Sequence, residues 1–435
     1  MKKIKRFLCF ALCAAMLTGL TACNDQTKTW DGVLTGALDS GTFELQIYTG
    51  GYGAEMWEEL IAEFEAAYPD LNVVAYLDPN VNQQMSTRWM NQNPPDFVLL
   101  DGTGIPRDVW LEEGLLLDLT EWLESATVYG TQTKISQVLN EDIVATYKGK
   151  IYELPVWISA YGIWYDNTYF TQNNLSMPES YTELKAFTQR AAELGKPVMC
   201  YPGQYPGYLG WGFVLPAIAA YGQEFFDRVM SGTDPQVFLD ERFVSVMERL
   251  EEYTSDNRNF LSGTVDLGHI TSQTEWLAHN ALLIPNGLWL RKEMEDSTPE
   301  DFDMIFSPSP LITEDQTPTI PVTGITVGIS TFGDNQIAAM EFMRFLYQND
   351  VLANFMTLSD TPVAADVDLT GIEISETLQQ IQEIMSSPDI QVVTKKTSWG
   401  AVDAVFNNSM NEIVLGMKTA EQLCNEYAEA AKKNG

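Results

Sequence analysis

The stretch of residues 150–170 constrains the fold most, because it joins two halves of the chain that carry different patterns. It is dense in large aromatic side chains and contains Pro155. A proline keeps the residue before it, here Leu154, extended, and it lacks the N–H group that a central strand ladder needs. We therefore interpret this stretch as a crossover between two lobes, with Trp157 and Tyr161 beside the crossing. A ligand cleft between the lobes is expected at this place.

The length of the chain agrees with two lobes. A chain of 435 residues is too long for one ordinary hydrophobic core and fits two domains of about 150 to 200 residues each. Its composition is 45% hydrophobic and 11% aromatic, which is typical of a globular protein.

The first 22 residues are typical of an export signal. Basic residues near the start precede an apolar run over 7–20, which is too short to span a bilayer comfortably and ends in small residues. Leu20-Thr-Ala-Cys23 resembles the lipobox of bacterial lipoproteins, in which the cysteine becomes the lipidated N-terminus. The alternative is an ordinary signal peptide with a chance cysteine. Residues 23–41 are polar and without periodicity, so we expect a flexible tether.

The charge and the cysteines exclude several classes of protein. Acidic residues number 60 against 25 basic ones, and the formal net charge is −35 at pH 7. Such a surface repels nucleic acid and anionic membranes, so nucleic acid is not expected as a partner. Beyond the signal and Cys23, only Cys200 and Cys424 remain, which is no disulfide framework. They form either one long-range bridge or two unpaired buried thiols.

The first half has an α/β pattern. Apolar residues alternate over 43–47 as in a half-buried strand, and helical spacing follows from Trp57 to Ala67, ended by Pro69. Strands are expected over 71–77 and 97–100. A strand, a helix and a strand in this order predict parallel pairing, a right-handed crossover and ligand sites at the carboxyl ends of the strands.

After the crossover, the sequence marks helix starts and one aromatic loop. Ser180-x-x-Glu183 is a capping box whose helix is closed by Gly195. Residues 200–211 are expected as a loop rich in Tyr, Pro and Gly, and residues 325–330 as a strand that returns to the first lobe. Further helices are expected over 338–346 and 351–358, from Ser398-Trp399 through Ile413, and after a second capping box at Thr419-x-x-Gln422.

These segments resemble one family of binding proteins. The crossover carries Gly149-Lys150-Ile-Tyr-x-Leu-Pro155, then Trp164-Tyr165-Asp166-Asn167 and Phe170. It resembles the crossover of extracellular solute-binding proteins of ABC transporters, with the maltose-binding group of sugar binders as the nearest branch. Other segments match in order and spacing from Phe43 to Ala431: Ile61-x-x-Phe64-Glu65 with Pro69, Asn93-Pro94-Pro95-Asp96-Phe97, Gly114-Leu-Leu-x-Asp118-Leu119-Thr120, and Ala281 through Gly287-Leu-Trp289.

The resemblance implies an α/β, two-lobed, periplasmic-binding-protein-like fold (type II), with hinge crossovers and a central ligand cleft. Its first lobe would be discontinuous, over 42–152 and 325–366. Its second lobe would cover 153–324 and 367–435. It also implies that the tryptophan of Gly-x-Trp, Trp289, and the tryptophan that opens the late helix, Trp399, stack on the ligand.

Patterns for catalysis or metal binding are weak. His269 and His279 are the only histidines, and neither has a cysteine or carboxylate at ligand spacing. Gly50-Gly51-x-Gly53 is a poor phosphate cradle, because Glu55 at the following helix start would repel the anion. We expect no catalytic residue, no metal and no cofactor.

The aromatic residues are the better signal. A flat ring packs on the C–H face of a sugar, while acids and amides hold the hydroxyls. Trp157, Trp289 and Trp399 each lie at an element boundary, although each could instead belong to a core. The candidate ligand-binding residues are Trp289, Trp399, Trp157, Tyr161, Trp211, Asp101, Tyr52 and Glu55.

The sequence thus predicts a lipid-anchored, extracytoplasmic binding protein, monomeric, that closes on a carbohydrate and delivers it to the permease subunits of an ABC importer. Two alternatives stay open. One is a secreted surface hydrolase or lyase acting on glycans, and the other is a binding protein for a non-sugar solute. Unpaired basic residues are scarce near the expected cleft, which disfavours an anionic ligand.

Overall fold

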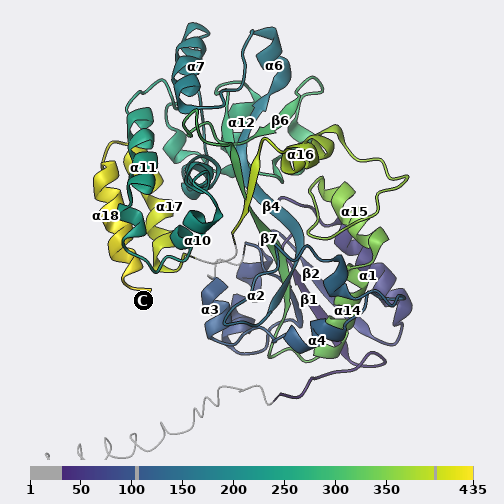
Figure 1. The fold of residues 1–435 in the computed structure, drawn as a ribbon. Helices are drawn as coiled ribbons and strands as arrows, with labels where there is room; N and C mark the ends of the chain where they lie inside the picture. Colours follow the sequence, from purple (N-terminus) through teal and green to yellow (C-terminus); the bar gives the residue numbers. More distant parts are fainter. Residues whose placement is uncertain (1–31, 103–106, 396–398, 435) are drawn as a thin grey trace, which may run out of the picture.

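The computed structural model describes residues 32–102, 107–395 and 399–434, and these form two lobes joined by long strands (Figure 1). The strands make one sheet in the order β2-β1-β3-β7-β4-β5, with β6 paired to β4 and β8 paired to β7. This confirms the expected two-lobed α/β class. The strands are β1 (Thr42–Ile47), β2 (Asn72–Leu77), β3 (Phe97–Leu99), β4 (Glu153–Asp166), β5 (Ile284–Gly287), β6 (Met304–Ser307), β7 (Thr319–Ile329) and β8 (Gln391–Thr394).

The first lobe is built on parallel strands. β1 pairs in parallel with β2 and with β3, as the strand-helix-strand order predicts. Phe43 of β1, Phe64 of α1 and Phe342 of α14 are fully buried and pack with centroid distances of 5.3 to 5.6 Å. The helices of this lobe are α1 (Glu55–Ala67), α2 (Val81–Met90), α3 (Arg107–Glu112), α4 (Thr120–Ser125), α5 (Ile135–Val138), α14 (Gln336–Leu346) and α15 (Asn349–Ser359).

Strands β4 and β7 connect the lobes. They run antiparallel, and their register shifts between Pro155 and Trp157. A proline without an N–H explains the interruption that the sequence predicts, but the chain continues through it as one strand of 14 residues. β7 begins at Thr319, six residues before the expected return strand, because its first part pairs with β8 in the second lobe.

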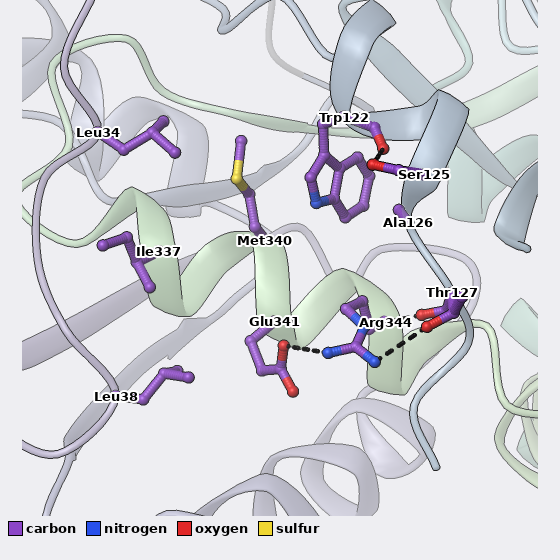
Figure 2. Close-up of a pocket in the computed structure, with 10 residues that line it drawn as sticks. All are labelled: Leu34, Leu38, Trp122, Ser125, Ala126, Thr127, Ile337, Met340, Glu341 and Arg344. Carbon is purple, nitrogen blue, oxygen red and sulfur yellow. Dashed lines mark hydrogen bonds and ion pairs between the residues drawn. The ribbon is translucent and has the colours of Figure 1, made fainter. Parts of the chain in front are cut away.

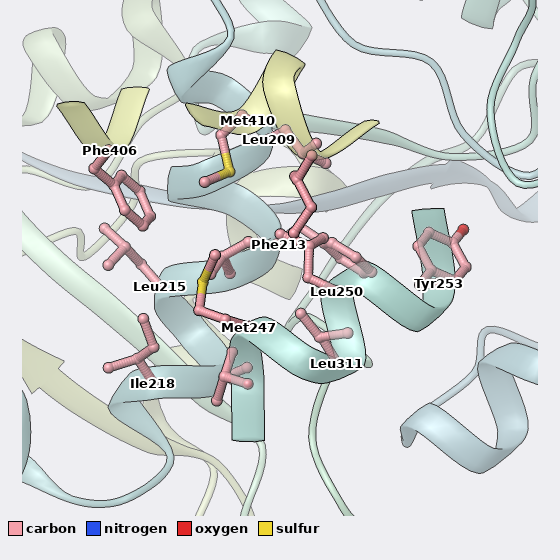
Figure 3. Close-up of a cluster of buried hydrophobic side chains, with 14 of the residues drawn as sticks. Leu209, Phe213, Leu215, Ile218, Met247, Leu250, Tyr253, Leu311, Phe406 and Met410 are labelled. Carbon is pink, nitrogen blue, oxygen red and sulfur yellow. The ribbon is translucent and has the colours of Figure 1, made fainter. Parts of the chain in front are cut away.

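The second lobe is mainly helical around its own core. Figure 3 shows part of it, where Phe213 of the π-helix η1 (Gly210–Val214) lies among side chains of α11 and α17, including Leu250 and Met410. Its helices are α6 (Asn167–Gln172), α7 (Tyr181–Glu193), α8 (Gly207–Leu209), α9 (Leu215–Ala219), α10 (Gln223–Met230), α11 (Glu241–Thr254), α12 (His269–Leu277), α13 (Leu290–Glu293), α16 (Glu376–Ser386), α17 (Ala401–Val414) and α18 (Ala420–Ala431), with short 3-10 turns at Val237–Leu239, Thr264–Asp266 and Glu295–Ser297.

Separate cores underlie the two lobes. One large cluster of buried apolar residues draws on 43–157, 327–363 and Leu378, and another on 163–283, 311–312 and 393–431. The lobe boundaries expected at 152/153, 324/325 and 366/367 stay a prediction.

Local sequence signals have mixed outcomes. Thr419 and Gln422 form the predicted capping box of α18. Ser180 accepts from the Glu183 amide, but the Glu183 carboxylate accepts from Glu179 instead of completing the box. The expected loop over 200–211 is partly wrong, because its end is helical in α8 and η1.

Both remaining cysteines, Cys200 and Cys424, are buried free thiols rather than a bridge. Burial raises the pKa of the Cys424 thiol to about 12, so it stays protonated at neutral pH. Within the described ranges, no helix is both long and apolar enough to cross a membrane.

The end of the expected tether is bound to the first lobe. The Thr35 amide donates to Gln336 Oε1 over 3.2 Å, and Asn335 Nδ2 donates to the Ala37 carbonyl over 2.9 Å. Leu34 and Leu38 line a cavity of about 450 Å³ against α14 and α4 (Figure 2). The prediction of a flexible tether over 23–41 is therefore wrong for its last part, which contacts the first lobe. The signal, Cys23 and the other residues up to 31 lie outside the described residues.

Candidate functional site

Six aromatic side chains from both lobes gather where the lobes meet. We call Tyr48, Tyr52, Tyr161, Tyr208, Trp211 and Trp289 the aromatic cluster. Tyr48 and Tyr52 lie on the turn after β1 in the first lobe, and Tyr161 lies on β4 beyond the Pro155 bulge. Tyr208 and Trp211 come from α8 and η1, and Trp289 directly precedes α13.

Tyr161 is at the centre of the aromatic cluster. Its ring centroid lies 5.0 Å from Trp289, 5.1 Å from Trp211 and 5.7 Å from Tyr208, all edge to face. Trp289 also contacts Tyr52 of the first lobe, at 5.9 Å. Trp289 therefore touches aromatic rings of both lobes, while keeping part of its surface exposed.

Two glycines make room for Trp289. A Cβ on Gly287 would lie 2.2 Å from the Trp289 ring, and a Cβ on Gly51 would lie 3.1 Å from it. Gly51 also has a φ of +82°, a conformation that side chains other than glycine rarely adopt. Of the glycines in the loop after β1, Gly51 thus leaves room for the Trp289 ring, whereas Gly50 lies against Tyr48.

Two carboxylates, one from each lobe, adjoin the aromatic cluster. Asp101 follows β3, and its neighbour Gly102 lies against the Tyr48 ring, where a Cβ would be 3.1 Å away. Glu293 ends α13, four residues after Trp289. Burial raises the pKa of Asp101 to about 6, opposed by the hydrogen bond from the Gly102 amide, and burial also raises the pKa of Glu293.

The charges of these carboxylates raise the pKa values of nearby tyrosine hydroxyls. Burial, followed by the charges of Asp101 and Glu293, raises the pKa of Tyr48 to about 12. Burial also raises the pKa of Tyr208, and Glu293 and Asp101 are among the groups that add to the shift. The tyrosine hydroxyls are therefore neutral at physiological pH and available as hydrogen-bond donors.

Polar groups of α12 complete the surroundings. Gln273 Nε2 donates to Glu293 Oε2 over 2.6 Å, and Gln273 Oε1 is buried without a described partner. The His269 ring stacks on Tyr205 at 3.9 Å and meets Tyr208 at 5.0 Å. Burial lowers the pKa of His269, so this imidazole is neutral at pH 7.

Ion pairs between the lobes flank the aromatic cluster. Arg291 of α13 donates to Asp360, at the end of α15, over 2.5 Å. Lys292 lies 3.5 Å from Glu55 at the start of α1 and 2.8 Å from Glu295. The α13 turn therefore places Trp289, Arg291 and Lys292 against the first lobe in one short segment.

The structure brings Trp289, Tyr161, Trp211, Tyr52 and Asp101 of the predicted residues together, with Glu55 at the edge of the group through its pair with Lys292. Whether they contact a ligand stays a prediction. Two predicted residues lie elsewhere, and for these the structure corrects the expectation.

Trp157 is a core residue behind the aromatic cluster. It is fully buried, stacks on Tyr52 at 4.8 Å with an interplanar angle of 8°, and donates from Nε1 to Ser359 Oγ over 3.0 Å. Because its ring is fully buried against Tyr52 and its N–H is bound to Ser359, Trp157 supports Tyr52 rather than facing a ligand.

Trp399 also belongs to a core. It is 2% exposed and packs at 4.5 Å on Phe406 of α17, within the second-lobe helices. The helix begins at Ala401 after Gly400, and Ser398, the expected cap, lies outside the described residues. An element boundary in sequence is therefore no guarantee of a position at the site.

Sequence reasoning missed Tyr48, Tyr208, Glu293, Gln273 and His269. Two of these had a usable signal. Tyr208 lies in the aromatic segment before Trp211, and Glu293 follows Trp289 by one helical turn. Tyr48 and Gln273 reach the site only through the tertiary fold.

The site offers no catalytic constellation in the described part of the chain. No group of three His, Cys, Asp or Glu side chains that could hold a metal occurs there. What the arrangement provides is rigid aromatic surface, neutral hydroxyls and two acceptors at the junction of two lobes. The fold and the site together define a two-lobed binding protein.

Comparison with known families gives this class a name. The family model described as bacterial extracellular solute-binding protein matches residues 50–353, which is more than half of the chain. The chain belongs to this family. Its members are binding proteins and not enzymes.

Individual relatives agree with this assignment. The diacetylchitobiose binding protein NgcE of Streptomyces coelicolor is 26% identical over 355 residues, covering 77% of this chain and 72% of the relative. The apo form of RafE from Streptococcus pneumoniae has a TM-score of 0.69 at 18% identity, covering 92% of this chain and 99% of that one. A chitin oligosaccharide binding protein has a TM-score of 0.73 at 16% identity, covering 91% and 99%. At these identities, the two solved structures support the fold.

Proposed function

We propose that this protein is the lipid-anchored substrate-binding component of an ABC importer, that it closes its two lobes around an oligosaccharide, and that it delivers this sugar to the membrane permease. The observation that carries the proposal is the aromatic cluster, to which both lobes contribute side chains. A ligand that contacts both lobes stabilises the closed arrangement by as much as it prefers that arrangement over an open one.

The choice of a sugar rests on the chemistry of the aromatic cluster. Tryptophan and tyrosine rings pack on the apolar faces of pyranose rings, and the hydroxyls and carboxylates around them suit sugar hydroxyls. Trp289 and Tyr161 present such rings, and Asp101 and Glu293 supply acceptors. The relative NgcE is a diacetylchitobiose binding protein, which supports a sugar of at least two units.

A thermal-shift screen against neutral and amino oligosaccharides tests the proposal. A true ligand at a hundred times its dissociation constant adds about 2.7 kcal/mol to the stability of the protein. We expect at least one oligosaccharide to raise the melting temperature, to bind with one-to-one stoichiometry by calorimetry, and to be recovered unchanged. Release of a shortened product would favour a glycan hydrolase or lyase, and a response only to non-sugar solutes would exclude the sugar assignment.

Anchoring is tested separately, because it rests on the sequence of residues 20–23. Cys23→Ser, expressed in a bacterial host, should move the protein from the membrane fraction to the soluble fraction. A matched substitution of another thiol, Cys200→Ser, should not. Equal retention of Cys23→Ser and the unsubstituted protein in the membrane fraction would contradict the lipid anchor without touching the binding role.

A further inference from the structure

Asp101 and Glu293 act on the same aromatic rings from opposite lobes. The charges of both raise the pKa of Tyr48, after burial, and the charges of both contribute to the raised pKa of Tyr208. Asp101 also raises the pKa values of Tyr52 and Tyr161, again after burial. Both carboxylates therefore act on Tyr48 and Tyr208, and Asp101 also acts on Tyr161, the central ring of the aromatic cluster.

Neither carboxylate has a basic partner among the described residues. Asp101 accepts from the Gly102 amide, and Glu293 accepts from the Gln273 amide. The nearby cations of α13 are engaged elsewhere, since Arg291 pairs with Asp360 and Lys292 pairs with Glu55 and Glu295. A neutral amide donor does not neutralise a carboxylate, and a buried or half-buried carboxylate without a counter-charge is costly.

The aromatic rings add a second attraction for positive charge. A cation over the face of a tyrosine or tryptophan ring gains roughly 0.5 to 2 kcal/mol, more when it is desolvated. The ring centroid of Tyr161 lies within 5.7 Å of the ring centroids of Trp289, Trp211 and Tyr208. Rings and carboxylates together make a surrounding that favours an ammonium group and opposes an anion.

We propose, on the basis of the function proposed above, that the ligand is a cationic amino sugar: an oligosaccharide of glucosamine type with at least one free ammonium group. The pyranose face packs on Trp289 and its neighbours, and the ammonium donates to Asp101 or Glu293. N-acetylation removes the charge and adds bulk at the same position. A hydroxyl in place of the amine keeps a donor but has no charge.

Three β-1,4-linked disaccharides separate these chemistries, because they differ only in the group on ring carbon 2. They are the glucosamine dimer with free amines, the diacetylated dimer and cellobiose. Hydrogen bonds to charged groups are worth about 1.5 to 3 kcal/mol, so calorimetry at about pH 7 should show the free-amine dimer binding roughly 10- to 100-fold more tightly than the other two. Spermidine serves as a cation without a sugar ring and should bind much more weakly.

Variants assign the effect to the carboxylates. Asp101→Asn and Glu293→Gln keep size and hydrogen bonding but remove charge, and each should reduce the preference for the free-amine dimer toward the level of the neutral sugars. Asp70→Asn and Glu65→Gln remove exposed carboxylates of the first lobe and should leave the preference unchanged. A melting curve for each variant checks that it is folded.

The outcomes separate this inference from the proposed function. Equal or tighter binding of the neutral disaccharides, or a preference for the amine that survives both charge-removing variants, would overturn the amino-sugar assignment and leave the oligosaccharide role standing. Binding of spermidine without binding of any disaccharide would overturn both. Absence of binding to all four probes would overturn the amino-sugar inference, and the thermal-shift screen would decide the proposed function.

Discussion

Replacing Trp289 by alanine separates a ligand-stacking ring from a core ring. Trp289 is part-exposed and meets three tyrosine rings, Tyr161 at 5.0 Å, Tyr52 at 5.9 Å and Tyr208 at 6.4 Å. Three aromatic pairs at about 0.5 to 1 kcal/mol each predict a loss of roughly 1.5 to 3 kcal/mol of stability in the ligand-free protein.

The loss of binding should be larger than this. In the Trp289→Ala variant, a bound sugar ring no longer stacks on the indole and no longer buries its face, and these two contributions together are worth about 2 to 4 kcal/mol of binding. Affinity for the best oligosaccharide of the screen should therefore fall roughly 30- to 1,000-fold. Calorimetric titration and a denaturation midpoint, measured on the same preparation, give both quantities.

Trp399→Ala is the matched control, because Trp399 is 2% exposed within the second-lobe core. Truncation of a buried tryptophan costs about 3 to 5 kcal/mol of stability. We expect a large fall in the melting temperature and near-native affinity in the protein that remains folded. The reasoning is refuted if Trp289→Ala binds the oligosaccharide normally while folded Trp399→Ala does not. That result would mean that Trp399, and not Trp289, stacks on the ligand.

Three further predictions concern charge and closure. The pKa of Asp101 is raised from 3.8 to about 6 in the folded protein. The folded state therefore binds this proton more tightly than the unfolded state does, and the ionised carboxylate lowers the stability of the protein as pH rises from about 4 to about 6. Asp101→Asn should therefore raise the melting temperature of the ligand-free protein at about pH 7, with a gain of at most about 3 kcal/mol in the free energy of unfolding. The gain should be smaller at about pH 4. A larger gain at about pH 4 than at about pH 7 would contradict the raised pKa. Arg291→Met leaves the buried Asp360 carboxylate without its partner from the other lobe. It should cost about 1 to 3 kcal/mol of stability, with the lower figures reflecting the partial exposure of Arg291, and it should weaken sugar binding. Thermal melts and titrations that match the unsubstituted protein would exclude this pair as an interlobe contact. Small-angle scattering should give a smaller radius of gyration when saturating oligosaccharide is added, and an unchanged curve would argue against hinge closure though not against binding.

Much of the fold follows from local pattern. The alternation over 43–47, the helical spacing up to Pro69 and the capping box at Thr419 predict β1, α1 and α18, because each signal depends on neighbours in sequence. The bulge at Pro155 follows from the missing N–H. The long continuation of β4 and β7 through both lobes could not be predicted in this way, since it depends on pairing between segments that lie far apart in the chain.

The candidate site was predictable only in part. Trp289 is held by Gly287 and Gly51, and the glycine before Trp289 is visible in the sequence. Trp399 also lies near a helix start, yet the packing of Phe406 buries it. Local position did not distinguish the two tryptophans, because exposure is decided by the elements that fold against each ring. Tyr48 and Glu293 illustrate the converse, since neither is conspicuous until the loop after β1 meets the segment that leads into α13.

A crystal structure with the best oligosaccharide of the screen tests the central claim most directly. The claim is that side chains of both lobes hold the sugar at the aromatic cluster. It predicts one sugar ring stacked on Trp289, with polar contacts from Asp101 or Tyr48 of the first lobe and from Glu293 or Tyr208 of the second. A sugar that contacts one lobe only, or that lies in the cavity beside Trp122 and Met340, would contradict the claim.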